Sequence, residues 1–520
     1  MKRILKHVGQ QQIMILIIML LSACLSLFLA TKKEGMHNDE YSTYKLANAE
    51  EDERIFNPTY GVRLDANEVF ESYFYPNGFS LKNVWLNQKA DVHPPLYYLF
   101  FHIFILLTHH FLELKTGILL NIVIHMINIV LVWLVLKEML LVKNMDLLGT
   151  ILYAFLPSVL GNVMFIRMYV LLSTFMLAIT LLFAKEWNKS ERKVFYLKLG
   201  LLSVAGTMTH YYFLIYLFYC CVVWGIYIIS RRKWKELSVF IGTMAASGVV
   251  CLLIFPYMLQ HIFESGRGQE AFAAVFSLST FISNGKVFWE SIDNVYSGFL
   301  LAILVLASGL LMYRFYIGRE ADQKPSFDFR WFCIFFACTL YVVTVAKVAP
   351  YSASRYIAPI YAICIVLLMG LFDKIVSAVS ARADVRWILG VFLLGLLLNN
   401  GYNRYTWPEL YRENMERTAE ARTYGANNEC IYIISKSYHG NCSYPEFIQY
   451  RNITFIQDID LDLLYTEEYA GYDHVVMYID RAIDQKMTND ILGKMVEMNP
   501  GLDSYKELHA SDYNDVYYLD

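Results

Sequence analysis

The chain has 520 residues, of which 57% are hydrophobic and only 18% are charged, and its formal net charge is −3. A soluble protein of this length needs more charge to cover its surface, so this composition excludes an ordinary soluble enzyme. The near-neutral charge gives no indication of nucleic-acid binding. Apolar runs that approach or pass about 18 residues recur between residues 13 and 400, and each is long enough to cross a bilayer. The sequence therefore predicts an α-helical polytopic protein of the cell membrane.

The first apolar segment, residues 13–30, follows a basic stretch with Lys2, Arg3 and Lys6. It resembles a signal peptide, and residues 21–24 match a lipoprotein cleavage box. Because the downstream chain is itself membrane-embedded and needs no separate anchor, we favour an uncleaved first span with a cytoplasmic N-terminus.

The positive-inside rule orients the later apolar segments. These lie at residues 118–136, 147–161, 168–184, 194–209, 211–229, 237–259, 296–313, 331–346, 356–372 and 387–400, with a mixed loop at 260–293. Residues 94–110 are also apolar but open with Pro94 and Pro95, so they form either a span or a helix lying along or dipping into the membrane. If they do not cross, every basic loop falls inside, and eleven crossings leave the C-terminus outside. If they cross, another weak segment must cross too, and the number is thirteen.

We expect a membrane domain over residues 1–402, with a first extracytoplasmic loop at 31–93, and a soluble extracytoplasmic domain at 403–520. In the latter, short strands are predicted at 430–434 and 474–479 and a weaker one at 449–456, with helices at 407–424 and 484–498. This pattern predicts a small α/β domain. Its Cys430 and Cys442 either form a disulfide or stay apart, because sequence spacing does not define Cβ geometry.

Ionisable residues at the ends of apolar segments are candidate functional residues, because charged groups are costly to desolvate there. Asp39 and Glu40 follow the first span beside His37, and Asp91 and His93 precede the second apolar stretch. A carboxylate here acts as a general base or orients a hydroxyl. The alternative is an ordinary polar loop start, but the position after the first span favours a function.

Cations lie in turns that are expected on the same outer side, against the usual charge bias. They are Arg167, Lys347 and Arg355, and His210 lies in a similar turn. A lone arginine can merely extend to the interface, and a buried, hydrogen-bonded histidine is equally ordinary. An anion to be bound explains the set better, and phosphate suits it because arginine offers paired planar donors and lysine a point charge.

The sequence contains no Walker loop, no zinc-spaced Cys/His set and no Gly-rich dinucleotide turn, so no cofactor is evident, and dependence on a divalent metal stays open. An outward-facing site has no access to cytoplasmic nucleotide sugars. A phosphate-bearing lipid that is reached sideways from the bilayer fits it.

The order of these motifs resembles the family 39 glycosyltransferases of the GT-C superfamily, which includes protein O-mannosyltransferases and the lipid A aminoarabinose transferase. The motifs are residues 37–40, 91–98, 167–169, 209–212 and 355–359, and the resemblance covers residues 1 to about 400. It implies transfer of a sugar, with inversion, from a polyprenyl- or dolichyl-phosphate donor on the outer face. By this resemblance Asp39 activates the acceptor with Glu40 beside it, and Arg355 and Arg167 hold the donor phosphate. Lys347 and His210 are further candidates for this phosphate because of their placement. Supporting residues would be His37, Asp91, His93, Tyr169 and Tyr356.

The C-terminal domain is too small for the β-trefoil of the protein O-mannosyltransferases. An envelope glycolipid or polymer is therefore at least as good a candidate for the acceptor as a protein. Two other classes stay open: a transporter or flippase for lipid-linked sugars, and an envelope scaffold or receptor. A transporter is expected to place its ionisable residues near the bilayer midplane rather than at span ends.

Overall fold

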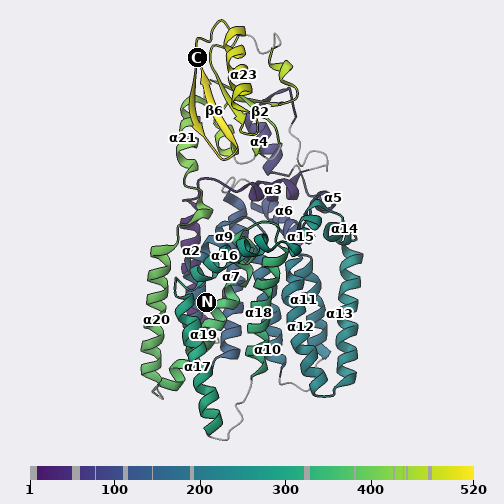
Figure 1. The fold of residues 1–520 in the computed structure, drawn as a ribbon, viewed down its shortest axis with the longest axis vertical. Coiled ribbons are helices and arrows are strands. Elements are labelled where there is room, and N and C mark those ends of the chain that lie inside the picture. The colour runs from purple at the N-terminus through teal and green to yellow at the C-terminus, as the bar shows by residue number, and fades with distance from the viewer. Residues whose placement is uncertain are drawn as a thin grey trace, which may run out of the picture. The chain divides into compact units, whose positions relative to one another are not determined.

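A computed structural model describes residues 9–49, 59–76, 78–108, 115–142, 144–187, 193–320, 328–379, 382–425, 428–436, 439–440, 443–465 and 471–520 (Figure 1). The basic residues before the first span, residues 109–110 and Cys442 lie outside these ranges. The chain divides into two compact units. The membrane unit comprises Met1–Thr31, Asp91–Tyr97 and Gly117–Trp407, and the sheet unit comprises Lys32–Ala90, Tyr98–Thr116 and Pro408–Asp520.

The membrane unit is almost wholly helical. Its helices are α2 (Gln10–Ala30), α7 (Thr116–Met139), α8 (Met145–Phe155), α9 (Pro157–Met164), α10 (Tyr169–Glu186), α11 (Lys193–Thr207), α12 (Tyr212–Ser230), α13 (Trp234–Ile254), α14 (Met258–Phe263), α15 (Gly266–Phe276), α16 (Leu278–Val295), α17 (Leu300–Glu320), α18 (Phe329–Val348), the 3-10 turns η3 (Ser354–Tyr356) and η4 (Ala358–Ile360), α19 (Tyr361–Val379) and α20 (Ala383–Arg404). Eight of the described helices are long and apolar enough to cross a membrane, and counting each of two bent pairs as one span raises the number to ten.

Each of the eleven predicted spans is helical in the structure. The one expected at 147–161 is the bent pair α8–α9, which turns by 48°. Pro157 opens α9 after an extended Leu156, and a proline at this position removes the hydrogen bond that would continue α8. Residues 260–293, expected as a mixed loop, instead lie in α14, α15 and α16 and the short links between them. The serine hydroxyls of Ser265 and Ser277 cap the starts of α15 and α16 and account for the local helix formation.

The stretch at 94–110 forms α6 (Leu96–Thr108), a helix of 13 residues that starts directly after the two prolines. At about 1.5 Å per residue it is roughly 20 Å long, whereas the hydrocarbon core of a bilayer is about 30 Å thick. This length agrees with the alternative in which the segment does not cross.

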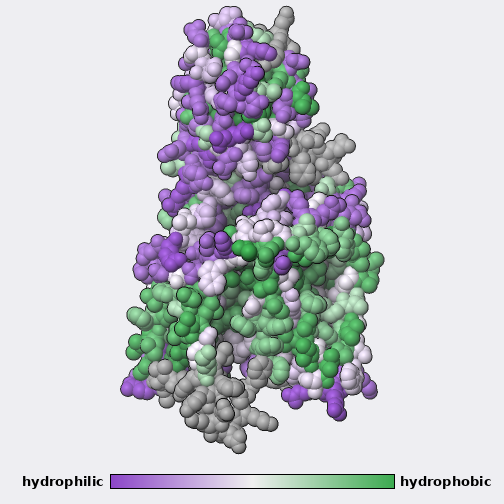
Figure 2. Space-filling view, in the orientation of Figure 1, coloured by the Kyte–Doolittle hydropathy of each residue, from purple (hydrophilic) through white to green (hydrophobic). Residues whose placement is uncertain are grey.

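The core of the membrane unit is packed with aliphatic and aromatic side chains, including fully buried Trp224, Tyr216 and Tyr341. In contrast, α13 and α20 expose large apolar side chains such as Val239, Leu253 and Phe392. Figure 2 shows the resulting apolar surface in green over the helices. A protein in water rarely exposes so large an apolar area, so these faces are suited to contact lipid.

The sheet unit is built on a six-stranded sheet in the order β1-β3-β2-β4-β6-β5. The strands are β1 (Arg63–Asp65), β2 (Glu429–Ile434), β3 (Asn452–Gln457), β4 (Val475–Asp480), β5 (Tyr505–Ala510) and β6 (Asn514–Leu519). Strand β2 runs parallel to both β3 and β4, and the outer pairings are antiparallel. The unit also contains α3 (Asn38–Asn48), α4 (Ala66–Phe74), α5 (Leu81–Ala90), η5 (Pro408–Leu410), α21 (Asn414–Gly425), α22 (Tyr444–Phe447), η7 (Leu461–Tyr465) and α23 (Gln485–Met498).

The three predicted strands are β2, β3 and β4, and the two predicted helices are α21 and α23. The β5–β6 hairpin and the edge strand β1 were not predicted. Strand β1 comes from the first loop, where Leu64 pairs with Ile453 and the Arg63 guanidinium bonds the Glu429 carboxylate. Cys430 is a buried free thiol in β2, and the two alternatives for Cys430 and Cys442 are not tested because Cys442 lies outside the described residues.

Candidate functional site

Asp91, His93 and Arg167 form a hydrogen-bonded series in the membrane unit. Asp91 Oδ2 lies 2.6 Å from His93 Nδ1, and His93 Nε2 lies 3.4 Å from an Arg167 amino nitrogen. Because arginine only donates, Nε2 accepts, and the ring proton lies on Nδ1 and points to Asp91. His93 thus bridges a carboxylate and a guanidinium.

The charges around Asp91 favour its ionised form. Burial raises the pKa of this carboxyl, but the neighbouring His93 and the charge of Arg167 outweigh burial and lower it overall. Asp91 therefore stays a carboxylate that fixes the orientation of the His93 ring.

Arg167 is held in the short turn between α9 and α10 and is 4% exposed. The Asn121 amide nitrogen of α7 donates to the carbonyls of Val163 and Phe165 in this turn, at 3.2 and 2.7 Å. Tyr97 donates to the Asn121 carbonyl oxygen at 3.0 Å. These buried polar contacts hold the backbone of the turn that contains Arg167.

His210 lies next to this series, with its ring 5.7 Å from His93 and 5.8 Å from Tyr169. Its Nδ1 accepts the backbone N–H of Tyr212 at 3.0 Å, which places the proton on Nε2. Burial lowers the pKa of His210 well below its usual value, and the nearby His93 and Arg167 lower it further. His210 is therefore a neutral hydrogen-bond donor at physiological pH.

Aromatic rings connect His210 to Arg355. The Tyr212 ring is 4.8 Å from His210 and 5.6 Å from Tyr356, and the Arg355 guanidinium lies 5.4 Å from the Tyr356 ring centre. The Tyr341 hydroxyl donates to the Tyr356 carbonyl at 2.8 Å and anchors this end. We call the set Asp91, His93, Arg167, Tyr169, His210, Tyr212, Arg355 and Tyr356 the cation–aromatic cluster.

Helix starts converge on the cluster. Arg167 precedes the first residue of α10, His210 precedes α12, and Arg355 lies in the turns that lead into α19. The N-terminus of a helix carries partial positive charge and unsatisfied N–H groups, which together favour anions. The cluster thus combines two guanidinium groups, a neutral imidazole donor and several helix starts, an arrangement suited to bind a phosphate.

Lys347, expected in the same set, has its contacts elsewhere in the membrane unit. Its ammonium donates to the Val275 carbonyl at 3.3 Å and lies 4.9 Å from the Phe281 ring centre. These contacts link the end of α18 to α15 and α16, which is a structural role. Its role at a phosphate stays a prediction.

The two acids of the first loop have different environments in the sheet unit. Glu40 is fully buried and forms an ion pair with Lys33, at 2.9 and 3.1 Å from the ammonium. Lys33 also donates to the Glu409 carbonyl at 2.8 Å, and burial lowers the pKa of Lys33 although Glu40 opposes this. Glu40 in turn accepts the N–H of His37 at 2.8 Å and closes a capping box at the start of α3.

Asp39 is the more accessible acid of the two. Its side chain is 29% exposed, and one carboxylate oxygen lies 3.7 Å from His37 Nδ1. His37 Nδ1 accepts the Asp39 backbone N–H at 3.0 Å, so the histidine is the N-cap residue of the helix that carries Asp39. The Asp39 side chain is therefore partly exposed, whereas Glu40 is buried against Lys33.

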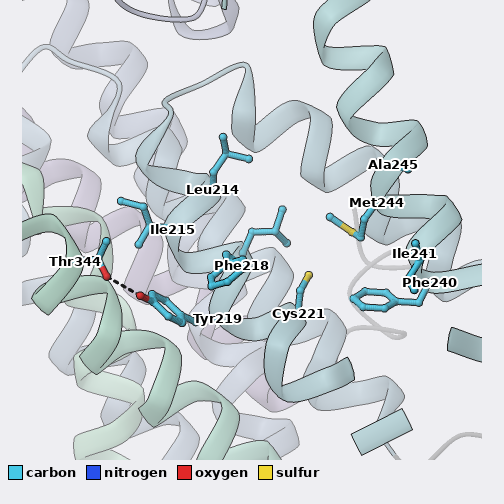
Figure 3. A pocket seen from close by; sticks show the side chains of 11 residues that line it. Leu214, Ile215, Phe218, Tyr219, Cys221, Phe240, Ile241, Met244, Ala245 and Thr344 are labelled. Atoms are coloured by element: carbon cyan, nitrogen blue, oxygen red, sulfur yellow. Dashed lines mark hydrogen bonds between the residues drawn. The ribbon is translucent and has the colours of Figure 1, made fainter. Parts of the chain in front are cut away.

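An apolar cavity of 780 Å³ lies between α12, α13 and α18 in the membrane unit (Figure 3). Its wall on α12 runs from Leu214 to Cys221, and Phe240 and Met244 face it from α13. The one hydrogen bond drawn in Figure 3 joins Tyr219 to Thr344 at 2.7 Å. The cavity begins two residues after Tyr212 and is suited to hydrocarbon.

Sequence reasoning found most of the cluster and missed its supports. Asn121 and Tyr341 lie inside apolar helices and belong to no motif, and Tyr97 was noted only as part of the stretch 91–98. A buried asparagine in a span is itself a usable signal. Lys33 was missed because one lysine after a span is ordinary. Within the described residues, no group of three or more His, Cys, Asp or Glu side chains is placed to hold a metal ion.

No family model matches the sequence, and no curated protein matches it. Among solved structures, the chain is similar to ArnT from Cupriavidus metallidurans bound to undecaprenyl phosphate, with 11% identity, a TM-score of 0.49 and coverage of 96% of this chain and 97% of that one. It is also similar to the archaeal oligosaccharyltransferase AglB from Archaeoglobus fulgidus, in complex with an inhibitory peptide and a dolichol-phosphate. For AglB the identity is 10%, the TM-score is 0.46, and 94% of this chain and 71% of that chain are covered. Both TM-scores are below 0.5, so we take no functional conclusion from either likeness.

Proposed function

We propose that the chain is a GT-C-type membrane glycosyltransferase that moves a sugar from a polyprenyl-phosphate-linked donor to an acceptor on the outer face of the membrane. The observation that carries this proposal is the cation–aromatic cluster. Arg167 and His210 both lie next to His93, and Arg355 is linked to His210 through the rings of Tyr356 and Tyr212. A phosphate is the anion that such a set binds best.

The donor lipid is bound in two parts. Arg167 and Arg355 hold the phosphate, and His210 donates to it through Nε2. The apolar cavity along α12 takes the first part of the prenyl chain, because it begins two residues from Tyr212 and is lined mostly by hydrocarbon. Tyr169 and Tyr356 shape the polar end of the site.

The transfer step is a direct displacement at C1 of the sugar. The acceptor hydroxyl or amine forms the new bond to C1 while the bond from C1 to the lipid phosphate oxygen breaks, which inverts the anomeric centre. Asp39 orients the acceptor and takes its proton, a role supported by the family resemblance and by the accessibility of its carboxylate. The arginines stabilise the negative charge that grows on the departing phosphate.

A flippase for lipid-linked sugars is the main alternative. Transporters place charged side chains near the bilayer midplane on interrupted helices. The cations of the cluster lie instead in turns before helix starts, which favours chemistry at one face.

The experiment is a transfer assay with the purified chain in proteoliposomes and a polyprenyl-phosphate sugar donor. Arg355→Gln removes one guanidinium while keeping the side chain polar, and we expect about a 10- to 100-fold loss of kcat/KM for the donor, because hydrogen bonds to charged groups contribute about 1.5–3 kcal/mol. Arg382→Gln is the control, since Arg382 is 75% exposed and pairs with Asp384, two residues away. Equal activity of both variants would remove Arg355 from the phosphate site.

A further inference from the structure

A second cavity, of 190 Å³, lies entirely within the sheet unit. It is bounded by the end of α3, by the residues just before α5, and by α6. The lining residues are Ala47, Asn48, Ala49, Gly78, Phe79, Ser80, Asn83 and His102. The cation–aromatic cluster contributes none of them, so this cavity is a separate feature.

Three polar residues besides His102 line this cavity: Asn48, Ser80 and Asn83. The buried Asn48 amide nitrogen donates to the Phe74 carbonyl at 2.6 Å, and its Oδ1 has no donor among the described residues. Ser80 caps α5, where its hydroxyl oxygen accepts the Asn83 N–H at 3.2 Å and keeps its own hydrogen to donate. A ligand that both donates and accepts hydrogen bonds would satisfy these groups.

The lining is electrically neutral. His102 Nε2 accepts the Ser80 backbone N–H at 3.1 Å, and Nδ1 lies 2.9 Å from the Ala47 carbonyl, so Nδ1 carries the proton and the ring is uncharged. Burial also lowers the pKa of His102, although the hydrogen bond to Ala47 opposes this. None of the eight lining residues is an acid, a lysine or an arginine. The lining is therefore unsuited to a phosphate, a carboxylate or an ammonium group.

The size of the cavity limits the ligand to one small group. At about 30 Å³ for each water molecule, 190 Å³ holds roughly six waters. Pockets for drug-sized ligands start near about 300 Å³. At the rim, the Phe79 side chain is 67% exposed, with its ring 6.0 Å from His102, and offers an apolar face against which a ring can pack.

We propose that this cavity binds a single neutral sugar ring, with its hydroxyls on Asn48, Ser80 and Asn83 and its apolar face on Phe79. The same helix, α3, carries Asp39 in its first turn and Asn48 at its end. At about 1.5 Å per residue, the two positions are roughly 13 Å apart along that helix. The binding itself is independent of the proposed function, and only the assignment of the ring to a substrate rests on it.

The structure offers a way to fill the cavity without disturbing the fold. Gly78 is one of the lining residues, and a Cβ built on it meets nothing within 4 Å, so Gly78→Leu adds bulk at the lining without a steric clash. Gly493→Leu in α23 is the matched control, because a Cβ there also meets nothing within 4 Å. Phe79→Ala removes the aromatic ring against which the sugar would pack. Phe263→Ala is its control, because the Phe263 ring on α14 is 70% exposed.

The probe is a panel of methyl glycosides of neutral hexoses and pentoses, followed by saturation-transfer NMR on the full chain in nanodiscs. We expect binding to the wild type, and at least a fivefold loss of signal in Gly78→Leu and Phe79→Ala but not in the controls. Absence of binding to every glycoside, or binding that Gly78→Leu leaves unchanged, would overturn the proposal.

Transfer kinetics then identify the source of the ring. A raised KM for the acceptor in Gly78→Leu assigns the ring to the acceptor, and a raised KM for the donor assigns it to the donor sugar. Glycoside binding in a chain that transfers no sugar would refute the proposed function alone. Transfer without glycoside binding would refute the cavity alone.

Discussion

At the scale of single residues, the two adjacent acids at the start of α3 differ in what surrounds them. Glu40 is closed off in an ion pair with Lys33, and Asp39 keeps an accessible carboxylate. The sequence predicted the pair but not this division, because the partner that buries Glu40 is seven residues earlier and carries no motif. The role of Asn121 was not predicted either. Its amide, on α7, donates to the backbone of the turn that contains Arg167.

Glu40→Gln is expected to lower stability more than it alters chemistry. Removing one member of a buried ion pair leaves Lys33 charged and unmatched, and this costs about 3–5 kcal/mol of the free energy of unfolding. Thermal unfolding of the purified variant measures it. The double variant Lys33→Met/Glu40→Leu should recover much of the loss, and an unchanged melting temperature in Glu40→Gln alone would refute the structural role.

Asp39→Asn is expected to keep the fold and lose the reaction. The amide has the same shape but does not take a proton, and loss of a general base lowers kcat by roughly 100- to 10,000-fold. Glu68→Gln is the control, because Glu68 is an exposed acid in the first turn of another helix of the same unit, α4. Normal turnover in Asp39→Asn would exclude this carboxylate from the mechanism.

At the scale of elements, the helices were predictable and their interruptions less so. Long apolar runs define α2, α7 and α12 by composition alone, and Pro157 explains the bend of α8–α9 in hindsight. Strand β1 has three residues, too few for a periodic signal, yet it joins the first loop to the edge of the sheet. The convergence of helix starts at Arg167, His210 and Arg355 depends on tertiary packing, which the sequence indicated only through charge placement.

A histidine connects three elements of the sheet unit and predicts a pH dependence. His509 of β5 lies 2.6 Å from Glu420 of α21 and 3.1 Å from Glu446 of α22, and Glu446 also accepts from Tyr478 at 2.9 Å. Burial lowers the pKa of His509, but the hydrogen bonds and charges of the two glutamates outweigh it and raise the pKa overall.

Because the pKa of His509 is higher in the folded than in the unfolded chain, protonated His509 stabilises the folded state. This stabilisation is fully present below the unfolded pKa of about 6.5 and is lost as pH rises through the folded pKa. The sheet unit should therefore melt at a lower temperature near pH 9 than near pH 6, and His509→Gln should make this difference smaller. Circular dichroism melts at both pH values measure it. An equally large difference in the variant would contradict the assignment to His509.

At the scale of the whole molecule, the apolar runs predicted a polytopic membrane protein and the C-terminal strand and helix pattern predicted a small α/β domain, and the structure confirms that fold class. The side of the membrane on which each unit faces follows from the charge pattern and stays a prediction. The division into units departs from chain order, because residues 32–90 belong with the C-terminal sheet rather than with the helices that flank them.

Cysteine labelling tests the orientation. A membrane-impermeant maleimide should label Asp503→Cys in intact cells and should label Lys233→Cys only after the membrane is opened, because both side chains are exposed and are expected on opposite sides. Labelling of the unmodified chain measures the background signal from its native cysteines. Labelling of Lys233→Cys in intact cells would reverse the topology and place the cluster on the inner face.

The most direct test of sugar transfer is to measure both products of the purified chain in one reaction with a polyprenyl-phosphate sugar donor. The mechanism predicts one free polyprenyl phosphate for each sugar that appears on the acceptor, with both products falling together in Arg167→Gln and Asp39→Asn. Intact donor that moves across the bilayer with no free polyprenyl phosphate would contradict the transferase and identify a flippase.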